Sequence, residues 1–166
     1  MLGCGTVGSQ IARLLVANKA DLTSRAGAQI ELAKVAVRDA KVKRDGVPDN
    51  LITTDANSIV NDPSIDLIIE VIGGISPAKE LILNALKNGK SVVTANKALL
   101  AKDGAELYEA ASKANVDLYY EAAVAGAIPI LRPLRESLVG DQVLQIMGIV
   151  NGTTNYILTK MDESGT

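Results

Sequence analysis

The sequence predicts an α/β fold: a doubly wound parallel sheet with helices on both of its faces. Apolar, β-branched segments alternate along the chain with segments of helical periodicity, which is typical of parallel strands joined by right-handed crossover helices. The 166 residues contain no Phe and no Trp, so the core must be built from Val, Ile, Leu and Ala, as in a parallel sheet that helices cover.

The first third of the chain is predicted to form a helix, a strand and a second, short helix. Apolar residues recur at helical spacing after the opening glycines, and a β-branched segment and then a polar segment follow. Asp55 is of a type that caps helices, and the sequence Asn-Asp-Pro at 61–63 ends one. The expected elements are a helix over 6–19 that residues 20–28 extend, a strand over 30–39 that ends near Arg38, a loop over 40–54 and a helix over 55–60.

Three further strands are expected in the middle of the chain, the first of them a near-continuous apolar run. The first is closed by Gly73 and Gly74, and the helix after it has Pro77 in its first turn and ends at Asn88 and Gly89. The expected elements are strands over 66–74, 91–97 and 117–124, with helices over 77–86 and 99–114 between them.

Beyond residue 124 the pattern changes. Pro129 is expected to open a helix that runs to Leu138, and residues 143–150 alternate like a strand with one face exposed or packed on a different layer. The segment NGTTNYILTKM, from residue 151 on, is predicted to be a loop that leads into a helix.

Composition excludes several functions. The formal net charge of −2 is too close to zero for a typical nucleic-acid binder, and no apolar run is long enough to cross a membrane, so a cytoplasmic protein is expected. One cysteine allows no internal disulfide bond. The absence of His excludes a Ser-His-Asp triad and a His-ligated metal, so any proton transfer must come from Lys, Tyr, Asp, Glu or water.

The first motif is GCGTVG, in which Gly3, Gly5 and Gly8 match G-x-G-x-x-G. The first glycine permits a tight turn, the second lets the backbone approach a pyrophosphate, and the third lets the helix pack close to the strand. The motif alone also fits a strand-to-helix turn without a ligand, but the predicted helix and strand after it favour a Rossmann-like dinucleotide site. Because only Met1 and Leu2 precede Gly3, we expect a shortened or missing first strand.

Residues at the ends of two strands bear on the identity of the cofactor. Arg38 suits a 2′-phosphate and favours NADP, whereas Asp39, which follows directly, leaves NAD open. Lys97 is expected at the rim of the cofactor cleft, where its ammonium would hold a carboxylate or carboxamide or polarise an oxygen. Both cations also suit an ordinary solvated surface position.

Two later segments carry weaker signals. In EAAVAGAIP, at 121–129, five small residues follow a carboxylate, and bare backbone carbonyls there would bind a cation; a close-packed corner is the simpler explanation. NGTTNY offers a helix N-terminus for an anionic group such as a substrate carboxylate, or an ordinary capped helix. Cys4 is interpreted as a small apolar filler in the glycine loop.

The chain closely resembles the homoserine dehydrogenase family, over essentially its whole length, in the segments GCGTVGS, VAVRD, VIGG, SVVTANKALLA, YYEAAVAGAIPI and GIVNGTTNYILTKM. The resemblance implies an oxidoreductase that uses NADP or NAD to interconvert L-homoserine and L-aspartate 4-semialdehyde, a step in threonine and methionine biosynthesis. It also implies a homodimer in the complete enzyme.

The resemblance further implies roles for particular residues. Lys97 would contact the nicotinamide and is the possible catalytic residue of this chain. The implied cofactor contacts are Gly3, Cys4, Gly5, Thr6, Val7, Gly8, Arg38, Gly73 and Lys97; the implied substrate contacts are Gly152 and Thr153; the implied sodium ligands, largely through main-chain oxygens, are Glu121, Val124, Gly126 and Ile128.

The resemblance also divides the chain, into an NAD(P)-binding domain over 1–128 and the beginning of an α+β substrate domain over 129–166. The family's proton-donor lysine would follow residue 166, so we expect a cofactor-binding fragment with little or no activity alone. Two alternatives stay open. Another NAD(P)-dependent dehydrogenase, such as an aspartate dehydrogenase, would need a catalytic His that this chain lacks, and a non-catalytic nucleotide-sensing module would need neither EAAVAGAIP nor NGTTNY.

Overall fold

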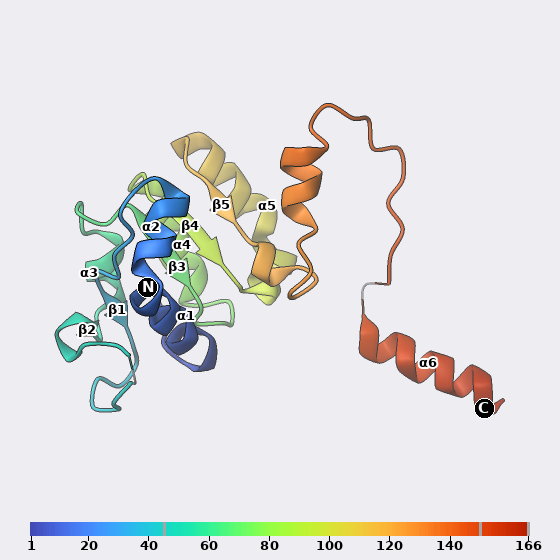
Figure 1. The fold of residues 1–166 in the computed structure, drawn as a ribbon, viewed down its shortest axis with the longest axis horizontal. Helices are drawn as coiled ribbons and strands as arrows, with labels where there is room; N and C mark the ends of the chain where they lie inside the picture. The colour runs from blue at the N-terminus through green and yellow to red at the C-terminus, as the bar shows by residue number, and fades with distance from the viewer. Residues whose placement is uncertain (45, 150, 166) are drawn as a thin grey trace. The chain divides into compact units, whose positions relative to one another are not determined.

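The computed structural model describes residues 1–44, 46–149 and 151–165. The chain separates into two compact units, Met1–Val124 and Ala125–Thr166, and each unit is described by itself (Figure 1). The predicted domain boundary at residue 128 stays a prediction.

The first unit is built on parallel strands, as the sequence predicts. The described residues form the strands β1 (Val35–Ala36), β2 (Ile52–Thr53), β3 (Leu67–Glu70), β4 (Ser91–Thr94) and β5 (Leu118–Tyr119). β1 pairs with β2, β3 with β4 and β4 with β5, and every one of these pairings is parallel. The α/β fold class is therefore confirmed.

The N-terminal segment, residues 1–3, lies between β1 and β3 and joins them. Leu2 forms parallel bridges to both Ala36 and Glu70. Its N–H donates to the Ile69 carbonyl at 2.7 Å, and its own carbonyl accepts from the Val71 N–H at 2.8 Å. The spatial order is thus β2, β1, the N-terminal segment, β3, β4, β5, which is the doubly wound order of dinucleotide-binding sheets. The expected short first strand is confirmed.

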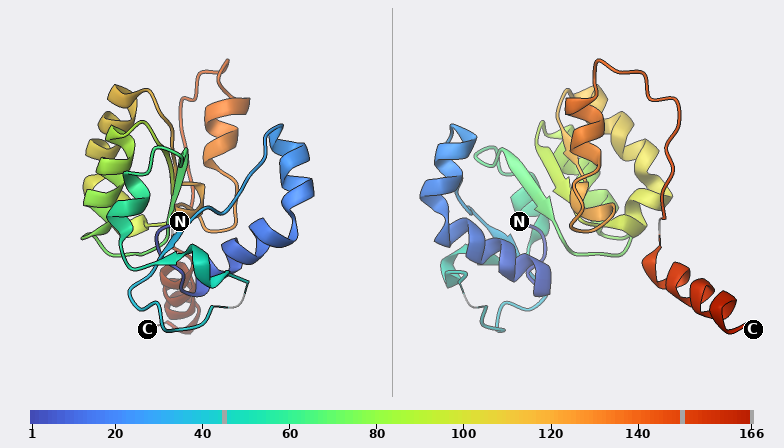
Figure 2. Two further views of the ribbon diagram at one scale, coloured as in Figure 1. Left: turned by 90° about the vertical axis from the view of Figure 1, so that its left-hand side faces the viewer. Right: turned by 45° about the vertical axis from the view of Figure 1, so that its right-hand side comes forward.

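Helices cover both faces of this sheet (Figure 2). The helices of the first unit are α1 (Thr6–Ala17), α2 (Lys19–Ala26), α3 (Ala56–Val60), α4 (Ala78–Lys87) and α5 (Lys97–Ala114), with short 3₁₀ turns η1 (Asp49–Leu51) and η2 (Glu121–Ala123). Local chemistry sets several of the ends. The Asp55 carboxylate accepts from the Ser58 N–H at 3.1 Å to cap α3, and Gly27, left-handed at φ 67°, ends α2.

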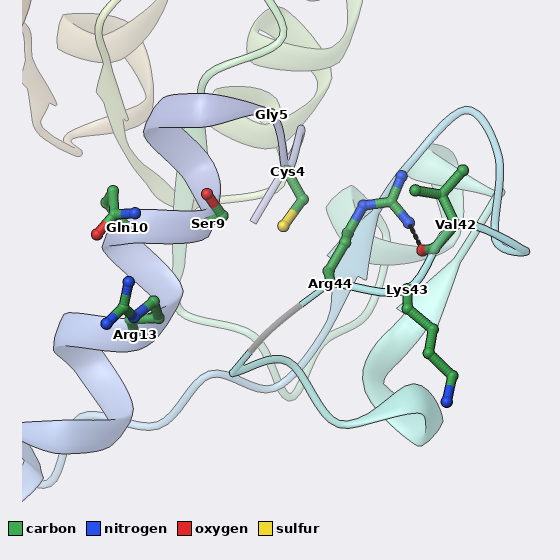
Figure 3. A pocket seen from close by; sticks show the side chains of 8 residues that line it. All are labelled: Cys4, Gly5, Ser9, Gln10, Arg13, Val42, Lys43 and Arg44. Carbon is green, nitrogen blue, oxygen red and sulfur yellow. Dashed lines mark hydrogen bonds between the residues drawn. The ribbon is translucent and has the colours of Figure 1, made fainter.

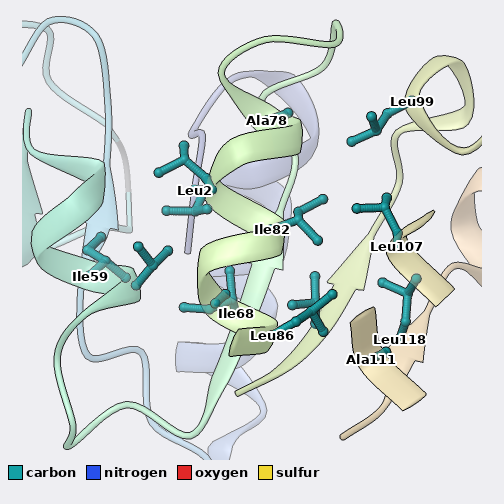
Figure 4. Close-up of a cluster of buried hydrophobic side chains, with 14 of the residues drawn as sticks. Leu2, Ile59, Ile68, Ala78, Ile82, Leu86, Leu99, Leu107, Ala111 and Leu118 are labelled. Atoms are coloured by element: carbon teal, nitrogen blue, oxygen red, sulfur yellow. The ribbon is translucent and has the colours of Figure 1, made fainter. Parts of the chain in front are cut away.

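Successive side chains of β3 point to opposite faces of the sheet, and each face carries a buried apolar cluster. Ile68 points into the larger cluster, which packs α3, α4 and α5 on one face of the sheet (Figure 4). Ile69 points to the opposite face and packs against a smaller cluster, which contains Ala12 of α1 and Val35 of β1. Two faces, each covered by different helices, make the sheet doubly wound.

Two predictions for the first unit need correction. The strand expected over 30–39 is limited to Val35–Ala36, because residues 30–34 make no described ladder and are mostly exposed. The loop expected over 40–54 contains η1 and also β2, whose Ile52 pairs with Val35. A two-residue strand is too short to show the alternation from which strands are predicted.

The second unit contains a π-helical turn, η3 (Pro133–Ser137), and the helix α6 (Gly152–Ser164). The helix expected from Pro129 begins only at residue 131 and runs to 137. The strand expected over 143–150 is wrong for 143–149, which the structure describes without any strand, and residue 150 lies outside the described residues. Alternation alone does not make a strand when no ladder partner is present. None of the described helices has the length and apolar character needed to span a membrane.

Candidate functional site

The candidate site lies where the winding of the sheet reverses. The chain leaves the N-terminal segment toward α1 on one face and leaves the neighbouring strand β3 toward α4 on the other face. Doubly wound sheets usually bind their ligand at such a divergence, in a crevice outside the carboxyl ends of the two adjacent strands.

The glycine turn has the shape that this position requires. Gly3 is at φ 96°, and a Cβ there would lie 2.8 Å from the Val71 carbonyl oxygen. A Cβ on Gly8 would lie 2.5 Å from the Gly3 carbonyl oxygen, so no side chain fits between α1 and the turn. The steric roles predicted for the first and third glycines are therefore observed in the backbone of this chain.

Gly5 differs from its two neighbours in the motif. A Cβ on Gly5 would meet no atom within 4 Å, and its φ of −86° is open to any residue. The space in front of Gly5 is therefore not needed by the fold. A glycine at this position of the motif lets the backbone approach a pyrophosphate closely.

The N-terminus of α1 adds the electrostatics of an anion site. α1 begins at Thr6, with Gly5 as its N-cap, and no described side chain caps it. Its first turn contains no acidic residue. The N–H groups of this turn and the positive end of the helix dipole are thus left to attract an anion.

A cavity of about 330 Å³ lies beside the turn (Figure 3). Three cations, Arg13, Lys43 and Arg44, lie among the residues that line it, and the full lining is Cys4, Gly5, Ser9, Gln10, Arg13, Val42, Lys43 and Arg44. The cavity reaches Gly5, so it is continuous with the position expected for a pyrophosphate.

Arg44 fixes the wall of this cavity opposite α1. Its Nη1 donates to the Asp39 carbonyl at 3.0 Å and to the Val42 carbonyl at 2.5 Å. Its Nε is buried and has no partner among the described residues. Burial raises the pKa of the Cys4 thiol, although the nearby Arg44 acts in the opposite sense. The cavity is thus lined by cations, and most of its lining residues are exposed to solvent.

Arg38 and Asp39, the residues predicted to choose the cofactor, follow β1 at the surface. The Asp39 carboxylate accepts from the Lys41 N–H at 2.8 Å, so it is engaged in its own turn. Arg38 is exposed and does not line the cavity, whereas Arg44 does. Sequence analysis missed Arg13 and Arg44. The left-handed backbone of Gly46 passes close to Arg13, and a Cβ there would lie 2.8 Å from the Arg13 Cγ, a proximity that no spacing in the sequence indicates.

Two further turns, at 71–74 and 95–97, follow β3 and β4 at the carboxyl ends of these strands, where the predicted ligand crevice lies. Gly73 and Gly74 are both left-handed, at φ 80° and 74°. Asn96 caps α5, its side chain accepting from the Leu99 N–H at 3.2 Å. Lys97 is the first residue of α5 and is exposed at the carboxyl end of β4. Gly73 and Lys97 therefore both lie on the edge of the sheet where Gly3 and Gly8 lie.

The remaining predicted site residues fall near or beyond the division between the units. Glu121 and Val124 close the first unit, and Gly126 and Ile128 open the second. No group of three or more Asp, Glu or Cys suited to a metal occurs among the described residues, but a sodium site of main-chain oxygens would not need one. The sodium ligands stay a prediction.

Gly152 and Thr153 begin α6, which the Asn151 side chain caps by accepting from the Thr154 N–H at 2.9 Å. The loop expected at NGTTNY is thus already helical from Gly152. This is the capped helix that the sequence left open beside an anion site, and substrate contact by Gly152 and Thr153 stays a prediction.

Comparison with known proteins matches two stretches of the chain to family models. Residues 3–121 match the family described as "Homoserine dehydrogenase, NAD binding domain", and residues 129–166 match the family "Homoserine dehydrogenase". Homoserine dehydrogenase of Corynebacterium glutamicum is 53% identical over 165 residues, and that of Mycobacterium tuberculosis is 52% identical over 165 residues. The chain spans 37% of the length of each of these relatives, and 99% of the chain is covered.

Solved structures show the same likeness. A homoserine dehydrogenase from Thiobacillus denitrificans has a TM-score of 0.85 at 44% identity, and the match covers 99% of this chain and 38% of that one. A hyperthermophilic archaeal homoserine dehydrogenase in complex with NADPH has a TM-score of 0.76 at 26% identity, covering 99% of this chain and 56% of that one.

Proposed function

The chain belongs to the homoserine dehydrogenase family, and we propose that its first unit binds a nicotinamide dinucleotide, with NADP favoured over NAD. The observation that carries this proposal is the turn Gly3–Gly8, packed tightly at Gly3 and Gly8 but open in front of Gly5. Tight packing at Gly3 and Gly8 matches the steric roles of the first and third glycines of a dinucleotide turn, and Gly5 leaves the start of α1 accessible to a ligand.

Each part of the dinucleotide has a matching feature. The pyrophosphate lies against Gly5 and the N–H groups at the start of α1, and Cys4, Thr6 and Val7 complete that turn. A 2′-phosphate is attracted by Arg38 and by the cations of the cavity, Lys43 and Arg44. The Asp39 carboxylate, the group that an NAD ribose would need, accepts one backbone N–H and keeps further acceptor capacity, whereas three cations line the neighbouring cavity. This arrangement supports NADP.

For the complete protein we propose the reaction of its relatives, the interconversion of L-homoserine and L-aspartate 4-semialdehyde in threonine and methionine biosynthesis. The cofactor supplies or accepts the hydride. Lys97, exposed at the end of β4 near Gly73, orients the nicotinamide end and polarises the substrate oxygen. Gly152 and Thr153 contact the substrate, and a sodium ion binds at Glu121, Val124, Gly126 and Ile128. A cytoplasmic homodimer is the proposed state of the complete enzyme.

The alternatives are less well supported. The curated relatives are homoserine dehydrogenases, which does not favour an aspartate dehydrogenase. A nucleotide-sensing module would explain residues 3–121 but not the second family match over 129–166.

Cofactor binding is tested on the 166-residue chain by fluorescence titration with NADPH and with NADH. We expect NADPH to bind more tightly. Gly5→Ala adds one methyl group where no protein atom lies within 4 Å, so the fold should be kept, with a small loss of stability because Ala is a poorer N-cap than Gly. The methyl group should displace the pyrophosphate, and we expect affinity to fall at least about tenfold. Gly104→Ala, within α5 and away from the crevice, is the matched control. Wild-type affinity in Gly5→Ala would show that the open space is not the pyrophosphate site.

A further inference from the structure

A fully buried carboxylate lies directly beneath the crevice. Glu70 ends β3 and has no exposed surface. Among the described residues its hydrogen bonds come from two backbone N–H groups and one hydroxyl, with no lysine or arginine beside it. Burying an unpaired carboxylate is costly, and an apolar pair would join two strands at least as well. The position of Glu70 therefore calls for an explanation beyond packing.

The carboxylate connects the ends of two neighbouring strands. Glu70 Oε1 accepts from the Ile72 N–H at 2.8 Å and from the Gly73 N–H at 3.2 Å, so it holds the turn that follows β3. Glu70 Oε2 accepts from the Thr94 hydroxyl at 2.6 Å, which ties that turn to the end of β4.

The connection continues through Thr94 and Asn96 into the start of α5. The Thr94 hydroxyl oxygen accepts from the Asn96 N–H at 3.0 Å. The Asn96 side chain then donates back to the Gly74 carbonyl at 2.6 Å and accepts from the Leu99 N–H at 3.2 Å. Thr94 and Asn96 are both buried. The chain of bonds thus runs from the turn at 71–74 to the first turn of α5 and returns to Gly74.

We propose that Glu70, Thr94 and Asn96, together called the strand-end clamp, are positioning residues for the dinucleotide. They hold two separate pieces of the crevice wall, the Gly73–Gly74 backbone and the helix start that carries Lys97, in one fixed geometry. This inference rests on the proposed cofactor function, because both pieces face the ligand only if the crevice binds one.

The backbone of the turn explains why a clamp is needed. Gly73 and Gly74 are consecutive and left-handed, and a Cβ on either would meet nothing within 4 Å, so packing does not restrain them. A glycine pair without packing samples many conformations. A carboxylate that accepts both N–H groups at the start of the turn removes that freedom before the ligand arrives, and preorganisation of this kind increases affinity.

The test compares three variants of the 166-residue chain. Thr94→Val keeps the shape of the side chain but removes the donor to Glu70 and the acceptor for Asn96. Thr94→Ser restores the hydroxyl. Val92→Ala, at a buried site two residues earlier in the same strand, is the control for general loss of packing. Amide hydrogen exchange at Ile72 and Gly73, NADPH affinity and urea unfolding are measured for each.

We expect Thr94→Val to exchange Ile72 and Gly73 about tenfold faster than wild type, with the Ile68 amide in β3 unchanged, and to bind NADPH about tenfold more weakly. Thr94→Ser should stay within about twofold of wild type in both measurements. Val92→Ala should lower the free energy of unfolding without a selective change in amide exchange at Ile72 and Gly73. If Thr94→Val fails to fold, the same measurements are made on Glu70→Gln, for which we expect NADPH affinity to be about threefold weaker than in wild type.

The outcomes separate the two proposals. Unchanged exchange at Ile72 and Gly73 in a folded Thr94→Val or Glu70→Gln chain overturns the clamp, whatever the cofactor does. Faster exchange with wild-type NADPH affinity overturns its role in positioning and leaves the cofactor site standing. A wild-type chain without measurable NADPH affinity overturns the proposed function and the positioning role with it.

Discussion

Gly8→Ala is a direct test of the packing between α1 and the glycine turn. The added Cβ would lie 2.5 Å from the Gly3 carbonyl oxygen and 3.2 Å from Val71 Cγ2. An ordinary contact between such atoms needs more than 3.4 Å, so α1 or the turn must move by roughly 1 Å. Overpacking of this kind costs about 1–3 kcal/mol, and here the obstacle is backbone, which cannot rotate away.

Helix propensity acts in the opposite direction and must be removed from the comparison. Gly→Ala within a helix gains up to about 1 kcal/mol from propensity alone. Gly104→Ala in α5 gains the same benefit, and its Cβ would lie 4.0 Å from Leu100 Cβ, an ordinary contact. The difference in unfolding free energy between the two variants is therefore the packing cost, about 1–3 kcal/mol.

Urea unfolding followed by circular dichroism measures that difference. With a slope of about 1–3 kcal/mol per molar urea, the two midpoints should lie of order 1 M apart, Gly8→Ala being the less stable. NADPH affinity of Gly8→Ala should also fall, because the turn that faces the ligand has moved. Equal midpoints for the two variants would refute the reasoning, since α1 could then not be packed on Gly3 as described.

Two other outcomes are expected. Lys90→Met should destabilise the chain by about 2 kcal/mol in thermal unfolding. The reason is that the buried ammonium donates to the carbonyls of Asp62 and Ile65, both at 2.6 Å, and Met leaves them unpaired. A loss of stability no larger than that of the exposed control Lys87→Met would contradict this role. Because burial raises the pKa of Cys4, its alkylation by iodoacetamide should reach half-maximal rate at a higher pH than that of a free cysteine, and NADPH should slow the reaction because Cys4 lines the cavity. A midpoint at or below that of free cysteine, or full reactivity in saturating NADPH, would be evidence against this placement of the thiol.

The elements that could be predicted are those whose signal is local. The helix from Thr6 shows several turns of apolar periodicity, and the cap at Asp55 needs only the three residues that follow it. The parallel sheet could be predicted because apolar, β-branched segments such as those of β3 and β4 alternate with helical segments along the chain. β2 could not, because Ile52 is strand only through its pairing with Val35. The alternation at 143–149 lacks such a partner and misled the prediction.

The candidate site divides in the same way. The three glycines could be assigned roles because each role is a property of one residue and its backbone. Arg44 could not be distinguished from other loop cations, since its place in the cavity wall depends on bonds to Asp39 and Val42 that only the folded loop creates. The Glu70–Thr94 contact joins residues 24 positions apart, and no spacing rule relates them.

The central position of Leu2 also bears on the order in which the unit folds. One residue near the start of the chain pairs with Ala36 on one side and with Glu70 on the other, so β1–β2 and β3–β4–β5 have no continuous ladder between them until Leu2 is in place. Forming contacts so far apart in the sequence first requires a large loop to close, and the entropy lost in that closure slows folding. The halves of the sheet are therefore expected to form first, and the crevice that the glycine turn lines is completed only when Leu2 joins them.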